Sequence, residues 1–201
     1  GSDPSAVGGA NQTVIGYGTT GVADNSVTLG NASVTKIYMN QNGNGKVVLG
    51  TIEFDASQAT LSTNANTLDD YEEGTWTLGL TFGGSATGIT VASSRNQGTY
   101  TKIGNRVHVN GWLNLSSKGS QTGTAVITGL PFTLANNVNA NSGCAIGYAD
   151  FTFADFPMMS PATNTTTISI HEVTNGGTVT AITNADFADD TNLMFSLSYN
   201  V

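Results

Sequence analysis

The chain has 201 residues, of which 38% are hydrophobic and only 10% are charged, well below the roughly 25% of charged residues in an average soluble domain. Six basic residues stand against 14 acidic ones and give a net charge of -8, which repels phosphate backbones and argues against nucleic-acid binding. No apolar run reaches the roughly 18 residues of a membrane-spanning helix, so we expect no membrane insertion.

The polar residues of the chain are mostly hydroxyls and amides rather than charges. The 25 glycines come with abundant threonine, asparagine and serine; threonine favours strands, and glycine and asparagine favour the turns between them. The composition therefore predicts an all-β protein of many short strands. No phosphate-cradling loop, Ser/His/Asp arrangement or paired-cysteine motif occurs, so we expect no cofactor.

Short apolar phrases closed by glycine recur near the start of the chain. Residues 1–13 carry no period and are expected to form a flexible lead, in which Gly1-Ser2 resembles a remnant of cloning. The phrases are Val14–Gly16, Val27–Gly30 and Val47–Gly50. A repeat of this kind cannot bury its apolar face alone, so neighbouring copies of the same chain are expected to cover it. We therefore predict a β-structured shaft over 14–50 in a fibrous homo-oligomer.

The pattern changes twice after the shaft. Apolar residues in 51–68 are irregularly spaced, which predicts an extended or weakly helical neck. From residue 69 to 201 the pattern is that of alternating strands, as in Trp76–Phe82, with a hairpin expected at Ile103–Arg106 and strands on either side of it within Tyr100–Leu115. We predict an antiparallel β-sandwich tip of jelly-roll type. Its further strands are expected at Thr124–Leu130, Cys144–Phe153, Thr166–Val173, Val179–Ile182 and Leu193–Val201.

Three strings resemble parts of known fibrous proteins. Leu68–Thr77, followed by Gly98–Val107, resembles the opening of C-terminal domains in tail fibre and receptor-binding proteins of tailed bacteriophages. Asn25–Ser33 is similar to the head repeat of trimeric autotransporter adhesins, a module also found in phage fibre shafts. The resemblance implies a parallel homotrimer with a β-structured shaft, a neck and a globular tip that touches the host surface.

An acidic cluster precedes the tip. Asp69, Asp70, Glu72 and Glu73 could supply the pair of carboxylates, about 5 to 9.5 Å apart, that a glycosidase needs. The simpler interpretation is a solvated turn or a polar cap on the neck, because the cluster comes immediately before a strand. We therefore predict a binding protein rather than an enzyme, with a surface-glycan hydrolase as the alternative.

Residues that bind metals elsewhere show no metal spacing in this chain. His108 and His171 lie on alternating strands and are expected to be surface or interface residues. The acidic run that contains Asp186, Asp189 and Asp190 lacks the regular spacing of a calcium loop. The single cysteine, in a run of small and apolar residues, is expected to be a small buried residue rather than a nucleophile. No metal site is predicted.

The segment Tyr148–Pro161 concentrates aromatic residues and methionines. Its first half is expected to continue a strand, with Phe151 and Phe153 in the core. Its second half is broken by prolines, which cannot donate to a central strand, and we predict a loop there. That loop would expose three apolar side chains for contact with a partner or another subunit, namely Phe156, Met158 and Met159.

Receptor contact is expected at the tip. Trp112 and Tyr148 could offer a stacking face for a sugar, with Asp150 among the hydrogen-bonding partners, although burial in the core also fits both aromatic residues. The predicted function is that of a homotrimeric adhesin at the distal end of a phage tail fibre, in the virion, binding a bacterial surface polysaccharide or an outer-membrane receptor. The alternatives are a bacterial trimeric adhesin head fragment and a virion trimerisation or cap domain.

Overall fold

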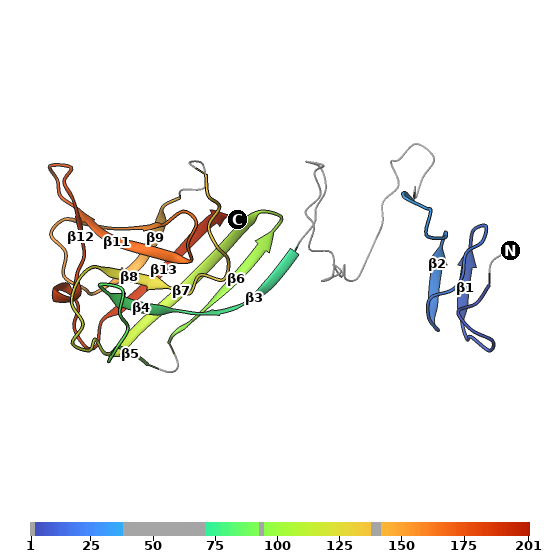
Figure 1. Ribbon diagram of the computed structural model, residues 1–201, viewed down its shortest axis with the longest axis horizontal. Helices are drawn as coiled ribbons and strands as arrows, with labels where there is room; N and C mark the ends of the chain where they lie inside the picture. Colours follow the sequence, from blue (N-terminus) through green and yellow to red (C-terminus); the bar gives the residue numbers. More distant parts are fainter. Residues whose placement is uncertain (1–2, 38–70, 93–94, 138–141) are drawn as a thin grey trace. The chain divides into compact units, whose positions relative to one another are not determined.

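The computed structural model describes residues 3–37, 71–92, 95–137 and 142–201 (Figure 1). The chain divides into two compact units, Gly1–Glu53 and Phe54–Val201. The predicted neck and the third glycine-closed phrase, Val47–Gly50, lie outside the described residues, as do Asp69 and Asp70. The predicted shaft and neck boundaries therefore stay predictions.

The first unit contains two short parallel strands. Strand β1 (Gln12–Ile15) pairs in parallel with β2 (Ser26–Leu29), and each residue lies opposite the one 14 positions later, as Gln12 lies opposite Ser26. This offset equals the spacing of the first two glycine-closed phrases in the sequence. An amide ladder continues it beyond the strand, because Asn11 Nδ2 donates to Asn25 Oδ1 at 3.0 Å. The first two phrases therefore stack on each other as predicted rungs.

The second unit is built from two antiparallel sheets, which we call the larger and the smaller sheet (Figure 1). The hydrogen-bonded order is β3-β6-β7-β13-β9 in the larger sheet, with β5 also paired to β7, and β10-β11-β8-β4 in the smaller sheet, with β12 also paired to β11. The larger sheet comprises β3 (Tyr71–Thr77), β5 (Thr90–Val91), β6 (Gln97–Ile103), β7 (Arg106–Ser117), β9 (Cys144–Ala149) and β13 (Asn192–Asn200). The smaller sheet comprises β4 (Gly79–Phe82), β8 (Ala125–Thr128), β10 (Phe156–Pro161), β11 (Thr167–Val173) and β12 (Val179–Ala181).

Both sheets direct apolar side chains into one shared core. Alternate residues of each strand are buried, so the inner faces of the two sheets meet and the outer faces remain open. The all-β prediction and the antiparallel sandwich are confirmed. The largest fully buried side chains are Tyr199, Phe82, Leu80, Leu113, Ile127, Leu134, Met159, Ile168, Ile170, Ile182, Leu193 and Leu197.

The predicted alternating run at the start of the tip forms two strands rather than one. Trp76, Leu78, Leu80 and Phe82 are all buried as expected. However, β3 pairs with β6 in the larger sheet, whereas β4 pairs with β8 in the smaller sheet. The chain crosses at Leu78, whose N–H donates to the carbonyl of Asn96 at 2.8 Å. Because both inner faces point into the same core, an unbroken alternation can continue across a change of sheet.

The predicted hairpin and its apolar face are confirmed. Strands β6 and β7 are antiparallel and turn at Gly104 and Asn105, where Gly104 has a φ of 57°. The odd-numbered residues Val107 to Leu115 of β7 are buried, and β13 runs antiparallel to β7 over the whole of Asn192–Asn200. The remaining predicted strands are present, with ends that agree or differ by up to four residues.

The proline-broken segment is a strand, so the predicted loop is wrong. Strand β10 is an edge strand of the smaller sheet, where it pairs with β11 on one side. Pro157 and Pro161 lack an N–H group, which an edge strand tolerates because one side of it needs no ladder partner. The predicted exposure of Met159 is also wrong, because its side chain points inward and is fully buried.

The aromatic half of the same segment leaves its strand early. Strand β9 ends at Ala149, four residues before the predicted end at Phe153. Phe151 is nevertheless buried, stacked on Phe187 with ring centroids 5.3 Å apart, and Phe153 packs edge-on against Phe151. The core prediction is therefore confirmed for Phe151, which reaches the core from a bend.

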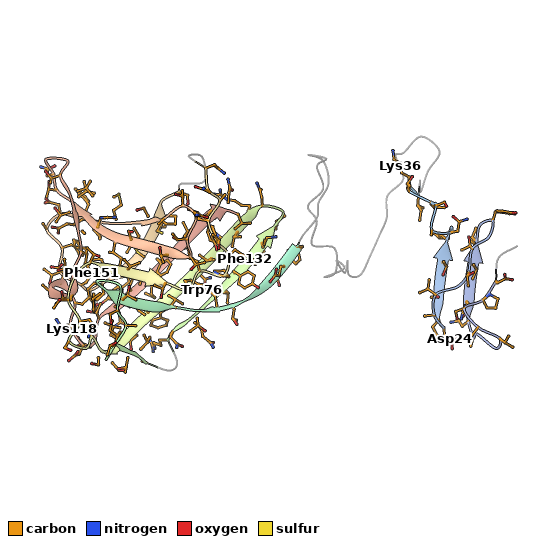
Figure 2. The ribbon with its side chains drawn as sticks, viewed as in Figure 1. Asp24, Lys36, Trp76, Lys118, Phe132 and Phe151 are labelled. Carbon is orange, nitrogen blue, oxygen red and sulfur yellow. The ribbon has the colours of Figure 1, made fainter. Side chains whose placement is uncertain are left out.

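A short helical turn closes the end of the sandwich near Phe151. The 3-10 helix η1 (Asn184–Asp186) is capped by Thr183, and the Lys118 ammonium donates to the carbonyls of Asn184 and Phe187 at 3.0 and 2.9 Å. Figure 2 shows Lys118 and Phe151 at this end of the sandwich and Phe132 at the other. In the parts of the chain that the structure describes, no helix is long and apolar enough to cross a membrane.

Candidate functional site

The outer face of the larger sheet carries a row of polar and aromatic side chains along β7. Because the odd residues of this strand point into the core, the even residues Arg106, His108, Asn110 and Trp112 point outward. The predicted polar face of this strand is confirmed. Trp112 belongs to it and is half-buried, so the alternative of a core tryptophan is wrong.

This face is hollowed beside Asn110 and Trp112. A hollow of about 550 Å³, which we call the large hollow, lies over β7, β13 and β9. Small residues on β13 and on β9 beyond it leave the space open, namely Ser196 on β13 and Ala145 and Gly147 on β9. Asn110, Trp112 and Met194 provide amide, indole and thioether surfaces around it. The hollow thus combines apolar surface with a few polar groups, as ligand sites usually do.

Trp112 and Tyr148 lie on opposite sides of Met194. In the strand register Met194 is the partner of Trp112 on β7 and of Tyr148 on β9, where a register shift follows it. Tyr148 is 48% exposed and Met194 36% exposed. Met194 was not predicted as a site residue, because the apolar side chains of its strand were expected to face the core. The available signal was a large apolar residue at one of the alternate positions of β13 that are otherwise polar.

A hydrogen-bond network holds the Trp112 end of the face. Asn192 Oδ1 accepts from Trp112 Nε1 at 3.3 Å and from Asn114 Nδ2 at 2.7 Å. Asp150 accepts in turn from the backbone N–H of Asn192 at 2.5 Å. Over the ring of Trp112 lies the guanidinium of Arg95, 3.9 Å from the centroid. The indole is therefore fixed in orientation before any ligand binds, which lowers the entropy cost of binding.

A second, small hollow of about 240 Å³ adjoins the first one. Both are lined by Ala145 and Ser196, so they follow one another along β13. Arg106 and His108 line the small hollow. Arg106 Nη1 donates to Asn200 Oδ1 at 3.0 Å, and His108 Nδ1 lies 2.8 Å from the hydroxyl of Ser198. Arg106 and His108 thus lie at the far end of the face from Trp112.

The predicted receptor-binding residues fall into three places. Trp112, Tyr148 and Asp150 come together at one end of the larger sheet's outer face. Phe156 and Met158 point outward from β10, on the other sheet, and Met159 is in the core. The structure therefore brings half of the predicted set together.

The outer face of the smaller sheet is apolar around Phe156 and Met158. Phe156, Val173 and Val179 form one cross-strand row over β10, β11 and β12. In the next row Met158 faces His171 across the ladder. Phe156 is 64% exposed and Val179 55% exposed. We call Phe156, Met158, Val173 and Val179 the apolar patch. None of these residues lines either hollow.

The described acidic residues serve as hydrogen-bond acceptors within the fold. Glu72 and Glu73 lie within β3 and not in a turn, so the predicted turn is wrong for these two. As neighbours on a strand they point to opposite faces. Glu72 accepts from the hydroxyl of Tyr100 and Glu73 from that of Tyr71, and these hydrogen bonds raise the pKa of each tyrosine.

The acidic loop near η1 is used in the same way. Asp186 accepts from Thr183 in a capping box, and Asp189 accepts from the backbone N–H of Lys118 at 2.8 Å. Among the described residues no three histidine, cysteine or acidic side chains gather as a metal site. Cys144 is partly buried, and burial raises the pKa of its thiol to about 12, which leaves it protonated at neutral pH.

Comparison with known proteins shows a likeness of fold. No family model matches the chain, and no curated protein matches it. Among solved structures, it is similar to the crystal structure of the Dettilon tailspike protein, with a TM-score of 0.56 and 22% identity. The likeness covers 65% of this chain and 24% of the tailspike chain. The chain therefore spans about a quarter of that protein's length.

Proposed function

We propose that this protein is a receptor-binding component of a bacteriophage tail, a homotrimeric adhesin at the distal end of a fibre that binds a glycan on the bacterial surface. The observation that carries the proposal is the hollowed outer face of the larger sheet, where Trp112 is oriented beside amides and small residues. The similarity of fold to a phage tailspike protein supports the assignment to a phage tail. So does the resemblance of Leu68–Thr77 to phage fibre tips.

The chemistry of the large hollow suits a sugar. A sugar ring has an apolar face of C–H groups that packs on an aromatic or thioether surface, and hydroxyls that need hydrogen-bonding partners. Trp112 and Met194 provide the first kind of surface, and Asn110 and Gln97 the second. One such site binds weakly, but three sites on one tip gain avidity without a new contact.

The first unit supports assembly from several copies. A two-stranded sheet is marginal in water unless its apolar face is covered. In the described part of this unit, Ile15, Val27 and Leu29 are 57%, 64% and 41% exposed, and the buried residues are Thr19 and Gly21. Identical copies aligned in parallel would bring these side chains together. Parallel alignment is what the repeat itself favours.

The apolar patch supports the same assembly from the tip. Exposed clusters of large apolar side chains on soluble proteins mark interaction surfaces. Phe156, Met158 and Val179 provide such a surface on the smaller sheet, opposite in the sandwich to the hollowed face. We assign the patch to contact between subunits, which leaves the hollowed face free for the receptor.

Binding to host cells tests the receptor site. The variant Trp112→Ala should bind intact cells and their extracted surface polysaccharide at least tenfold more weakly than the unchanged protein. Tyr17→Ala is the matched control, because Tyr17 is 90% exposed and belongs to the first unit. Binding unaffected by Trp112→Ala, with an unfolding midpoint equal to that of the unchanged protein, would contradict the site.

Sedimentation tests the assembly. The full chain is expected to sediment as a trimer, and Phe156→Asp together with Val179→Asp should shift the population toward smaller species as the protein is diluted. Ser160→Asp is the control, because Ser160 lies on the outer side of β10 but outside the apolar patch. A monomer at all concentrations would overturn the trimer.

The proposal is of binding without cleavage. Release of reducing sugars from host polysaccharide by the purified protein would favour the hydrolase alternative. That alternative predicts loss of the release in Glu72→Gln or Glu73→Gln, or in the corresponding amide variants of Asp69 and Asp70. Unchanged polysaccharide after prolonged incubation, with binding intact, supports the adhesin.

A further inference from the structure

The cationic side chains of this acidic protein fall into two groups: some are bound within the fold, and others lie at the hollowed face. The chain has six basic residues, of which two are arginines, against a net charge of -8. Both arginines lie at the hollowed face of the larger sheet. Arg95 covers the ring of Trp112 at one end, and Arg106 lines the small hollow at the other.

The described lysines of the second unit are committed to the fold. The Lys118 ammonium donates to two backbone carbonyls near η1. Lys102 is 6% exposed, with its ammonium 5.6 Å from the centre of the Phe132 ring. These two cations are therefore unavailable to a ligand, and the arginines at the hollowed face are the cationic groups that remain in the described part of this unit.

The Arg106 guanidinium is placed against neutral partners. To the described residues it donates one hydrogen bond, which the amide oxygen of Asn200 accepts, whereas a guanidinium can donate five. His108 next to it faces the Ser198 hydroxyl. The other lining groups of the small hollow are serine, glycine, alanine and leucine.

The described acidic side chains on the outer face of the larger sheet lie outside the small hollow. Glu73 lies on β3 and accepts a hydrogen bond from the hydroxyl of Tyr71. Strand β6 separates β3 from β7 in the sheet. Asp150 is held by Asn192 at the Trp112 end. Neither lines the small hollow, so Arg106 and His108 meet no carboxylate there.

We infer that the receptor glycan is acidic, and that a carboxylate or phosphate on it binds in the small hollow against Arg106 and His108 while neutral sugar rings extend along the large hollow toward Trp112. The planar fork of a guanidinium matches the paired oxygens of such anions. A chain of this net charge would repel an anionic polymer unless cations were concentrated at the contact. This inference rests on the proposed function and adds the class of glycan.

The experiment measures binding of the full chain to an immobilised panel of purified bacterial capsular polysaccharides. The panel includes members with uronic acids, members with phosphate monoester side groups and neutral members. Each uronic-acid member is also presented with its carboxyl groups reduced to alcohols, and each phosphate-bearing member after dephosphorylation, so that the polymer backbone is kept. We expect binding to acidic members, a loss of at least tenfold when the anionic group is removed, and weakening with added salt.

Variants locate the anion on the face. Arg106→Gln should weaken binding to the acidic polysaccharide by at least tenfold, and Arg106→Lys should retain part of it. Lys36→Gln is the control, because it removes the same charge from the first unit and should leave binding unchanged. Thermal unfolding of each variant shows whether the fold is kept. If Arg106→Gln does not fold, His108→Gln and the charge-removed polysaccharides still test the inference.

The outcomes separate the inference from the proposed function. Equal binding to the acidic and charge-removed forms, or an affinity unmoved by Arg106→Gln, overturns the acidic class while glycan binding stands. Binding to no acidic member of the panel also overturns the inference. Failure to bind host cells or any polysaccharide overturns the proposed function itself.

Discussion

At the scale of single residues, packing at two glycines shapes the larger sheet. Gly98 on β6 and Gly111 on β7 are register partners on its inner face. The space beside Gly98 is filled by the indole of Trp76, whose N–H donates to the carbonyl of Asn110 at 3.0 Å. Beside Gly111 lie the side chains of Leu78 and Phe195. The missing side chains thus make room for aromatic and aliphatic groups from other strands.

The variant Gly98→Ala is expected to destabilise the sandwich. An added Cβ would collide with the Trp76 indole and the Asn110 carbonyl, and overpacking of this kind costs about 1–3 kcal/mol. Gly143→Ala is the control, since nothing lies within 4 Å of a Cβ built there. Urea unfolding measures both. Equal midpoints for the two variants would contradict the packing account.

Tyr199 gives the sandwich a pH-dependent stabilisation. Its hydroxyl donates to the carbonyl of Phe132 at 3.2 Å and accepts from the N–H of the same residue at 3.3 Å. Burial raises the pKa of Tyr199 to about 12, above the value of about 10 for an unfolded chain. The folded state therefore favours the protonated phenol, and this stabilisation is full below pH 10 and lost as the pH rises to 12.

The variant Tyr199→Phe should show this loss. At pH 8 it leaves two backbone groups without their partner and should lower the free energy of unfolding by about 1–2 kcal/mol. Between pH 10 and 12 the difference should shrink, because only the unchanged protein carries the ionising group. Denaturant unfolding over this pH range is the measurement. A difference that stays constant to pH 12 would show that Tyr199 does not titrate with folding.

At the scale of elements, alternation predicts the face of a strand more reliably than its sheet. The run from Trp76 to Phe82 showed which side chains are buried, but it contains the crossing from β3 to β4. Prolines were equally ambiguous in the segment from Phe156 to Pro161. They exclude a central strand, and either a loop or an edge strand satisfies that condition. The ladder with β11 decided between them.

Neighbouring methionines on β10 test the assignment of its faces. Met159→Ala should lower the free energy of unfolding by about 2–5 kcal/mol, because the side chain is fully buried and its removal leaves a cavity. Met158→Ala should cost less than about 1 kcal/mol, because that side chain is 38% exposed. Urea unfolding of the tip measures both. Similar costs for the two variants would contradict the strand register.

At the scale of the whole molecule, the two units differ in how their apolar groups are covered. The sandwich has a core drawn from both of its sheets. The described part of the first unit exposes its isoleucines and all of its valines except Val14, and it buries a threonine and a glycine. The proposed assembly therefore predicts that the first unit depends on other copies for its stability more than the second unit does.

Removing residues 1–37 tests this difference. The truncated protein should unfold in urea within about 0.5 kcal/mol of the sandwich in the full chain, because it keeps every residue of that core. In the full chain, proteolysis within residues 3–37 should slow as the protein concentration rises, whereas cleavage of the sandwich should not change. Loss of the folded sandwich on truncation would show that the two units stabilise each other.

The candidate site could likewise be predicted only in part from the sequence pattern. Aromatic residues among amides pointed to Trp112 and Tyr148, and alternation placed Trp112 on the polar side of its strand. Met194, Arg95 and the hollows were not predictable, because they arise where β7, β13 and β9 lie side by side and a loop returns to Trp112. Contacts between segments that are distant in the chain leave no local signal in the sequence.

The sequence by itself determined the all-β class, the inward face of most strands, the hairpin at Gly104 and the stacking of the first two glycine-closed phrases, because each depends on a period or a turn within a few residues. The tertiary structure decided which sheet each strand joins, the edge position of β10, the burial of Met159 and the placement of Trp112 and Tyr148 on either side of Met194. These depend on which strands become neighbours, and that choice is made by the free energy of the shared core rather than by any one segment.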